Sequence, residues 1–250
     1  MGAFSWVAAM QARLAPDRLI VTAWPMAKAS KSPPIPDQDA LRRVGETVRK
    51  RLQDDPRAYP IPSEKVELFA FGDFLTAAEC ERLCLMIDLT ARPSSLHEVG
   101  YDSGFRTSYS GDLDPHDPFV RGIGERIDEA LGVNAVTGEA IQGQRYQPGQ
   151  EFKPHNDWFY TSENYWKEER KRGGQRSWTA MAYLNSVEHG GETHFTNIGI
   201  KIEPKPGVLL VWNNAKPDGS PNEDTLHAGT PVLAGSKYVI TKWYRTRRWK

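Results

Sequence analysis

Five short segments in the second half of the chain constrain the fold more than any other feature of the sequence. As a group they are rich in β-branched and aromatic residues, and glycine, proline or asparagine lies between them. From residue 139 on they read EAIQGQRYQ, SWTAMAYLN, GETHFT, GVLLVWNN and SKYVITKWYR. Several strands at short spacing with turn residues between them are typical of a β-sandwich or a β-barrel. The sequence therefore predicts a mainly β core.

The preceding part of the chain predicts helices that support this core. VELFAFGDFL alternates like a strand, and Thr76 follows it as a capping residue for a helix over AAECERLCLMIDLT. A second helix is expected over DPFVRGIGERIDEAL, with its end at Gly132. The expected class is α+β, in which an N-terminal helical layer packs against the β core.

Residues 1–62 have a different texture and predict an appendage to a main domain at 63–250. An apolar stretch from Phe4 to Leu14 is followed by KSPPIP and by a charged helical segment, DALRRVGETVRKRLQDD. Pro56, Pro60 and Pro62 then interrupt any continuous element.

The composition limits the classes of partner. With 250 residues, 39% of them hydrophobic, the chain can bury a substantial core. Its 32 basic and 32 acidic side chains cancel, so no net basic field favours nucleic acid or an anionic membrane surface. No apolar run approaches the roughly 20 residues of a membrane span, and the N-terminus lacks a signal-peptide pattern. We expect a cytoplasmic protein, whose oligomeric state the sequence does not indicate.

Cys80 and Cys84 lie four residues apart on one face of a predicted helix. This spacing holds their Cα atoms near the upper limit for a disulfide and does not match the usual zinc signatures. We expect reduced thiols.

The segment 160–176, YTSENYWKEERKRGGQR, is a long polar loop between two predicted strands. Loops of this length inside a domain are usually lids or binding segments. Glutamates interrupt its basic residues, which favours a solvated lid over a patch for an anionic partner. Trp158 and Trp166 are candidates for lining a substrate groove. The basic residues are Lys167, Arg170, Lys171, Arg172 and Arg176.

His155 and Asp157 form a His-x-Asp pair, whose side chains point to the same face of an extended segment. By itself the pair is weak evidence, since a capped turn explains it equally well. His227, at the start of another strand-like segment, adds a third ligand. Two histidines and one carboxylate leave coordination positions open, as in non-heme Fe(II) oxygenases, whereas a structural zinc would close its shell with four protein ligands.

Lys237 lies in the apolar strand SKYVITKW, where alternation places it on one face with Val239 and Thr241. A lysine in this position must either face solvent or pair with an anion, because burying it unpaired costs several kcal/mol.

Three motifs together resemble the catalytic core of the 2-oxoglutarate and Fe(II)-dependent dioxygenases, in particular the prolyl 4-hydroxylase branch. They are RYQPGQEFKPHNDWF, TAMAYLNSVEHGGETHF and LHAGTPVLAGSKYVITKWYR, in the order that this family has them, within a resemblance that covers about residues 66–246. The resemblance implies a distorted double-stranded β-helix, a jelly-roll or cupin-like barrel, with supporting N-terminal helices. It makes 63–250 the catalytic domain.

The resemblance also implies roles for individual residues. His155, Asp157 and His227 match the iron ligands, and Lys237 matches the residue that pairs with the distal carboxylate of 2-oxoglutarate. Tyr146 matches a tyrosine of the same pocket. The cofactors and cosubstrates implied are Fe(II), 2-oxoglutarate, O2 and, as reductant, ascorbate. Further cosubstrate-pocket positions are Thr179, Thr241 and Trp243.

The implied activity is hydroxylation of an unactivated carbon, most directly a prolyl residue of a peptide or protein, with conversion of 2-oxoglutarate to succinate and CO2. Two alternatives stay open: a hydroxylase of a free amino acid or other small molecule, and a barrel binding module that keeps the metal without oxygenase activity. The remaining histidines are expected to have structural or solvent-facing positions, and they are His97, His116, His189 and His194.

Overall fold

The computed structural model describes residues 35–94 and 104–250, and these residues belong to one compact unit. This unit is built on two antiparallel sheets and a two-stranded ribbon. In spatial order the large sheet holds β1 (Ala58–Pro60), β2 (Leu68–Phe71), β11 (Leu209–Asn213), β7 (Arg176–Tyr183), β14 (Lys237–Arg245), β5 (Gln142–Tyr146), β4 (Tyr109–Asp112) and β3 (Arg92–Pro93). The small sheet holds β10 (Ile200–Ile202), β9 (Thr193–Phe195), β12 (His227–Gly229) and β6 (Phe152–His155), and the ribbon pairs β13 (Val232–Ala234) with β8 (His189–Gly190).

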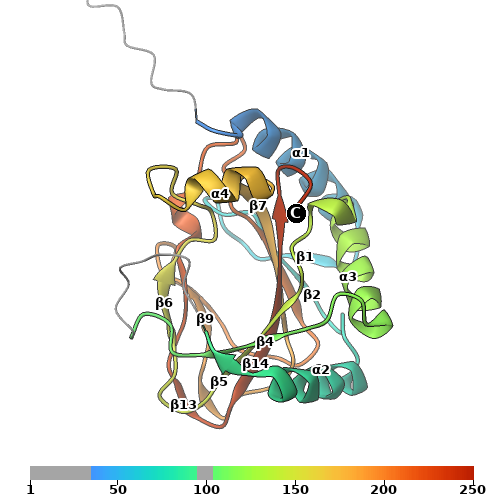
Figure 1. The fold of residues 1–250 in the computed structure, drawn as a ribbon, viewed down its shortest axis with the longest axis vertical. Coiled ribbons are helices and arrows are strands. Elements are labelled where there is room, and N and C mark those ends of the chain that lie inside the picture. Colours follow the sequence, from blue (N-terminus) through green and yellow to red (C-terminus); the bar gives the residue numbers. More distant parts are fainter. Residues whose placement is uncertain (1–34, 95–103) are drawn as a thin grey trace, which may run out of the picture. The chain divides into compact units, whose positions relative to one another are not determined.

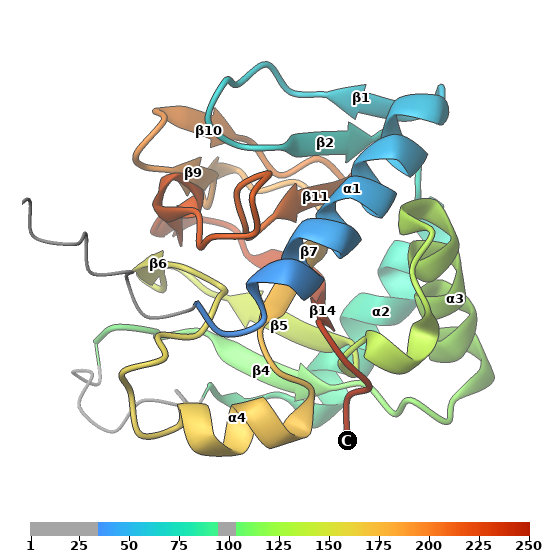
Figure 2. The same ribbon diagram turned by 90° about the horizontal axis from the view of Figure 1, so that it is seen from above.

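Three helices cover the outer face of the large sheet, and a fourth lies apart from them (Figures 1 and 2). The helix α2 packs on β4 and β5, where glycine permits a close approach: a Cβ at Gly143 would lie 2.3 Å from Cγ1 of Ile87. The helices are α1 (Gln38–Asp54), α2 (Ala77–Thr90), α3 (Pro118–Leu131) and α4 (Trp166–Arg172), with short 3-10 turns at Ala135–Thr137 and Glu223–Thr225. None of these described helices combines the length and apolarity needed to cross a membrane.

The central strands are buried on both faces, which explains their nearly continuous apolar sequences. On β7, Ala180 and Ala182 pack in the core under the helices, whereas Met181 and Tyr183 pack in a second core inside the barrel. Side chains of both sheets fill this inner core, for example Phe195 of the small sheet, whose ring lies 5.5 Å from Trp212 of the large one. The predicted class, a mainly β jelly-roll core with supporting helices, is confirmed.

Local signals in the sequence located the helices well. Thr76 caps α2 in a capping box with Glu79, and α3 ends at Gly132 in the left-handed conformation. Both cysteines are free thiols on α2. Burial raises the pKa of Cys84 to about 12, so it remains a protonated, unreactive thiol.

Two segments differ from their sequence-based description. The segment 160–176 is not only a loop, because it contains α4. The compact unit also includes α1 and β1, which lie in the predicted appendage; Val48 and Leu52 of α1 are buried in the main core, and β1 pairs with β2. The functional division into 1–62 and 63–250 stays a prediction, and Phe4–Leu14 and His97 lie outside the described residues.

Candidate active site

Three potential metal ligands converge inside the barrel. His155 ends β6 and lies directly opposite His227 of β12 in the strand register, and Asp157 follows His155 by two residues. The Nε2 atoms of His155 and His227 lie 4.0 and 3.9 Å from the two carboxylate oxygens of Asp157. Among the described residues, this is the one cluster of three or more His, Cys, Asp or Glu side chains with ligand atoms close enough to hold one metal ion.

Backbone carbonyls orient both imidazoles. Nδ1 of His155 lies 2.8 Å from the carbonyl oxygen of Lys153, and Nδ1 of His227 lies 2.9 Å from that of Thr225. A carbonyl can only accept, so each Nδ1 carries the proton and each Nε2 presents its lone pair to the cluster. Burial, with the nearby His227, lowers the pKa of His155 to about 3, so that ring is neutral and able to coordinate a metal.

Asp157 is fixed by a hydrogen-bond chain. The hydroxyl of Thr179 donates to Oδ2 of Asp157 at 2.7 Å, and the amide of Asn214 donates to the Thr179 oxygen at 2.9 Å. Burial by itself would raise the pKa of Asp157, but the neighbouring histidines, Arg176 and this hydrogen bond hold the pKa below its usual value. An ionised carboxylate beside two imidazole lone pairs is a donor set that suits ferrous iron.

A small inner cavity of about 40 Å³ lies beside the cluster, with Lys237 in its wall. Lys237 is 3% exposed, and no ion pair reaches it from the described residues. Its Nζ lies 5.4 Å from the ring centre of Tyr146 and 5.7 Å from that of Tyr183. Burial lowers the pKa of Lys237 to about 7, so the empty pocket destabilises the ammonium form that an anion would stabilise.

Polar groups continue along the wall of the inner cavity. The Tyr146 hydroxyl donates to Gln144 at 3.0 Å, and the Gln144 amide donates to the Thr241 hydroxyl at 3.4 Å. Thr241 and Trp243 also line this cavity. Thr179 instead lies behind Asp157, where its hydroxyl holds the carboxylate.

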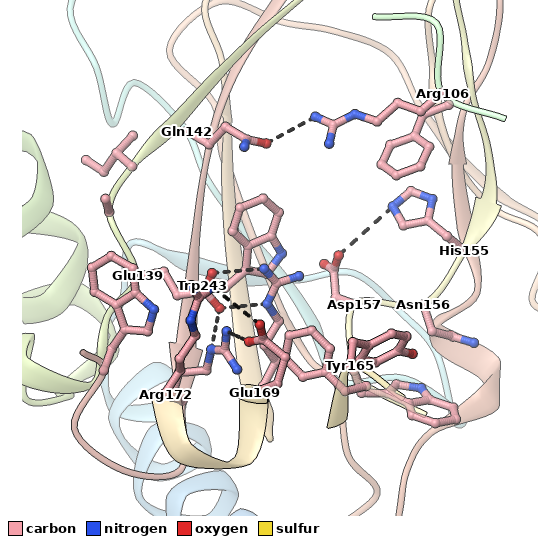
Figure 3. A pocket seen from close by; sticks show the side chains of 18 of the residues that line it. Arg106, Glu139, Gln142, His155, Asn156, Asp157, Tyr165, Glu169, Arg172 and Trp243 are labelled. Atoms are coloured by element: carbon pink, nitrogen blue, oxygen red, sulfur yellow. Dashed lines mark hydrogen bonds and ion pairs between the residues drawn. The ribbon is translucent and has the colours of Figure 1, made fainter. Parts of the chain in front are cut away.

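A larger outer groove of about 570 Å³ opens from the same centre. His155, Asp157 and Trp243 line both spaces, so any molecule in the groove lies next to the metal cluster. Figure 3 shows the groove between Arg106 and Gln142 at one end and Glu169 and Arg172 at the other. Trp158 lines the groove, whereas Trp166 is buried on α4 outside the lining that the described residues form.

A buried ion network forms the wall of the groove below α4. Arg176 binds both carboxylate oxygens of Glu139, at 2.7 and 2.9 Å, and Arg245 joins Glu139 to Glu169. The Arg176 guanidinium also lies 4.1 Å from the ring centre of Trp243. Assigning Arg176 to a solvated lid was therefore wrong, because its side chain is only 11% exposed.

Several polar residues of the groove have no role that the sequence predicts separately. Arg245 follows Lys237 by eight residues on one strand, so strand alternation places it on the same face as Lys237, which in the structure is the inner face. Arg106 stacks on Phe152, 4.7 Å from the ring centre, and donates to Gln142 at 3.1 Å. No local pattern marks Glu139, because its partners lie 37 and 106 residues away. The histidines expected to be structural or solvent-facing lie apart from the cluster, and within the described residues they are His116, His189 and His194.

The comparisons with known proteins agree with this geometry. Residues 141–245 match the model of the 2OG-Fe(II) oxygenase superfamily. The chain is 32% identical to probable prolyl 4-hydroxylase 8 of Arabidopsis thaliana over 205 residues, which cover 72% of this chain and 69% of that protein. It is 34% identical to a putative prolyl 4-hydroxylase of Acanthamoeba polyphaga mimivirus, covering 83% of this chain and 87% of that protein.

Solved structures show the same architecture. The viral collagen prolyl hydroxylase of Paramecium Bursaria Chlorella virus-1, in its 2OG complex, superposes with a TM-score of 0.57 at 27% identity, covering 70% of this chain and 94% of that one. A Pseudomonas putida prolyl-4-hydroxylase superposes with a TM-score of 0.50 at 18% identity, covering 82% of this chain and 99% of that one, which supports the fold alone.

Proposed function

Because this chain belongs to the prolyl 4-hydroxylase family of the 2OG-Fe(II) oxygenases, we propose that it hydroxylates a prolyl residue of a peptide or protein, with 2-oxoglutarate as cosubstrate. One observation carries the proposal: a cluster of two imidazoles and a carboxylate lies beside a buried lysine that has no ion pair among the described residues. A metal site alone would need no such lysine. The two features together fit a metal centre that works with a dicarboxylic acid.

In this proposal His155, Asp157 and His227 hold Fe(II) through Nε2, a carboxylate oxygen and Nε2. Bound ferrous iron supplies the activation of O2 that couples oxidation of 2-oxoglutarate to hydroxylation of carbon. The chain itself keeps the three ligands in place: backbone carbonyls fix both rings, and Thr179 fixes the carboxylate. Such supporting hydrogen bonds set ligand orientation and metal affinity.

Lys237 binds the distal carboxylate of 2-oxoglutarate in the inner cavity. The carboxylate supplies a counter-ion for the buried ammonium, which has no ion pair among the described residues. Folding has already removed water from the lysine, so binding of the cosubstrate does not pay that desolvation cost again. The Tyr146 hydroxyl lies at the same wall and becomes available to this carboxylate if it releases Gln144.

The outer groove accommodates the acceptor, with Trp243 between the acceptor and the cosubstrate pocket. Its volume, about 570 Å³, lies within the usual range of pockets that bind drug-sized molecules and exceeds what a single free amino acid needs. A viral relative of 27% identity is a collagen prolyl hydroxylase, which also supports a polypeptide acceptor. A free amino acid is the alternative substrate. The use of ascorbate, a cytoplasmic location and a catalytic domain at 63–250 stay predictions.

The test is release of succinate and transfer of oxygen. Purified protein with Fe(II), ascorbate and 2-oxoglutarate is expected to form succinate slowly alone and faster with a proline-containing peptide, which gains the mass of one oxygen atom. His155→Ala and Asp157→Ala are expected to abolish both products, while circular dichroism confirms that the variants are folded. Full turnover in either folded variant contradicts the ligand assignment, and hydroxylation confined to free amino acids contradicts the polypeptide acceptor.

A further inference from the structure

We propose that a basic patch at the edge of the outer groove binds acidic side chains that flank the target residue of the substrate polypeptide. This inference rests on the proposed function and specifies its substrate class. The patch joins two segments, α4 and the C-terminal residues that follow β14. Its members are Lys167, Arg170, Lys171, Arg172, Arg247, Arg248 and Lys250, all of them exposed.

The fold brings these two segments together although some 75 residues separate them in sequence. The backbone N–H of Lys250 donates to the carbonyl of Arg172 at 3.0 Å, and that of Arg247 donates to the carbonyl of Gly173 at 3.0 Å. The Arg247 guanidinium adds a bond to the Arg170 carbonyl at 2.7 Å. Figures 1 and 2 both show the C-terminus beside α4.

The patch borders the outer groove directly. Arg172 of α4 and Trp249 of the C-terminal segment are both part of the groove lining. A polypeptide that leaves the groove at this end therefore passes over the patch.

Most of the basic side chains in the patch have no ion pair with the residues that the structure describes. Lys171 pairs with the exposed Glu168 at 2.9 Å, and Arg247 pairs with Asp37. Arg172 lies 3.5 Å from a carboxylate oxygen of Glu169, but the same carboxylate also pairs with the buried Arg245. The members with no ion pair among the described residues are Lys167, Arg170, Arg248 and Lys250.

This excess of cations is local, because the whole chain has equal numbers of basic and acidic residues. Four cations without an ion pair among the described residues, in the two segments that give Arg172 and Trp249 to the groove lining, favour carboxylates on the molecule that occupies the groove. The lining of the adjoining groove mixes arginines with Glu139, Glu169 and Asp112, so it has no continuous basic surface for a phosphate backbone to follow. The arrangement therefore fits separate Asp or Glu side chains on a polypeptide better than nucleic acid.

The patch does not touch the metal cluster, so we expect it to affect the binding of the substrate and not the chemical step. We expect the KM for a proline-containing peptide with flanking glutamates to lie about tenfold below that of the same peptide with flanking glutamines at low salt. The advantage should shrink at about 0.15 M ionic strength, where surface charges are screened.

The decisive variant is the double charge reversal Arg170→Glu/Arg248→Glu. Its matched control is Lys201→Glu/Lys205→Glu, which makes the same change of charge at and after β10, at the side of the molecule opposite α4 in Figure 2. The ratio of KM values for the glutamine and glutamate peptides is expected to fall to about one in the patch variant and to stay near ten in the control. Fluorescence anisotropy of labelled versions of both peptides measures binding without turnover.

The outcomes separate this inference from the proposed function. Acidic peptide that binds at the patch but is never hydroxylated supports the inference and contradicts the function. Equal hydroxylation of both peptides by the parent protein contradicts the inference and supports the function. Loss of the ratio in both variants shows a general charge effect, and tighter binding of single-stranded oligonucleotide than of acidic peptide shows another partner class; either result overturns the inference.

Discussion

The inner cavity and the outer groove meet at the same metal cluster, yet they treat buried charge in opposite ways. In the inner cavity, the ammonium of Lys237 has aromatic rings around it and no ion pair among the described residues. In the wall of the outer groove, Arg176 and Arg245 share Glu139, and Arg245 also binds Glu169. An uncompensated charge prepares a site to bind a counter-ion, whereas a compensated network holds a shape.

This comparison predicts that removing the charge of the inner cavity separates stability from binding. Lys237→Met is expected to raise the free energy of unfolding of the free protein by about 1–3 kcal/mol, because it removes a buried cation that has no ion pair among the described residues. The same substitution should raise the KM for 2-oxoglutarate by a factor of about 100, because the carboxylate of the cosubstrate loses its charged partner. Urea unfolding and succinate assays measure the two effects.

Lys242→Met is the control, since it lies on the same strand but points to the other face, where Lys242 pairs with Asp128 at 2.5 Å. Lys242→Met should destabilise the protein, because the buried Asp128 carboxylate loses its ion pair, and should leave the KM for 2-oxoglutarate unchanged. A Lys237→Met protein that is less stable than the parent, or that keeps its affinity for 2-oxoglutarate, would show that Lys237 is paired in solution and has a structural role.

The outer groove should respond in the reverse way. Glu139→Gln removes the carboxylate that the guanidinium groups of Arg176 and Arg245 share in a nearly buried position. The free energy of unfolding should therefore fall by about 3 kcal/mol. Glu168→Gln, which removes an exposed pair on α4, is the matched control and should leave the unfolding midpoint unchanged. Equal midpoints for the two variants would mean that the network does not hold the groove wall.

A third prediction concerns the boundary between the two regions, where Thr179 fixes Asp157. Thr179→Val keeps the shape of the side chain and removes its hydrogen bond to the carboxylate. The affinity for Fe(II) should fall about 10- to 100-fold, as for other residues that support a metal ligand. Titration with Fe(II) or with Co(II) as a spectroscopic probe measures it, and Thr179→Ser, which retains the hydroxyl, is expected to restore most of the affinity. Equal affinities in the Val and Ser variants would exclude this supporting role.

The two regions also differ in how far the sequence predicts them. Strand alternation predicts that Lys237 shares one face with Val239 and Thr241, without deciding whether that face meets solvent, and the same period adds Arg245 to it. The pairing of β6 with β12, which sets His227 opposite His155, is non-local, and only the resemblance to a known family supplied it. Periodicity fixes which face a residue occupies but not which strand lies beside it.

The outer groove was harder to predict because its features depend on distant partners. The charged run from Lys167 to Arg172 has the composition of a solvated loop, but Glu169 turns inward to Arg245 and anchors α4 to the barrel. The charged composition of this segment also predicts an exposed Arg176, whereas in the structure Arg176 pairs with Glu139, 37 residues earlier in the chain. Charge pairs of this kind leave no local signature, since each residue taken alone is typical of a surface.

The smallest predicted effect, a dependence on pH, tests whether Lys237 is unpaired in the free protein. The folded protein releases the Lys237 proton near pH 7, whereas the unfolded chain keeps it up to the ordinary pKa of 10.5. Between these values the unfolded state binds more protons, so the stability of the free protein should rise with pH from about 7 toward 10.5. Affinity for 2-oxoglutarate should move the other way, by up to about tenfold per pH unit above 7, because the carboxylate needs the ammonium form.

The Lys237→Met protein is the reference for both measurements, since other groups titrate in the same range. The difference in melting temperature between parent and variant should narrow as the pH rises from 7 to 9, because the parent loses the unfavourable charge that the variant never had. A difference that stays constant over this range would place a permanent counter-ion beside Lys237, and the contrast between an unpaired inner cavity and a paired outer groove would then be wrong.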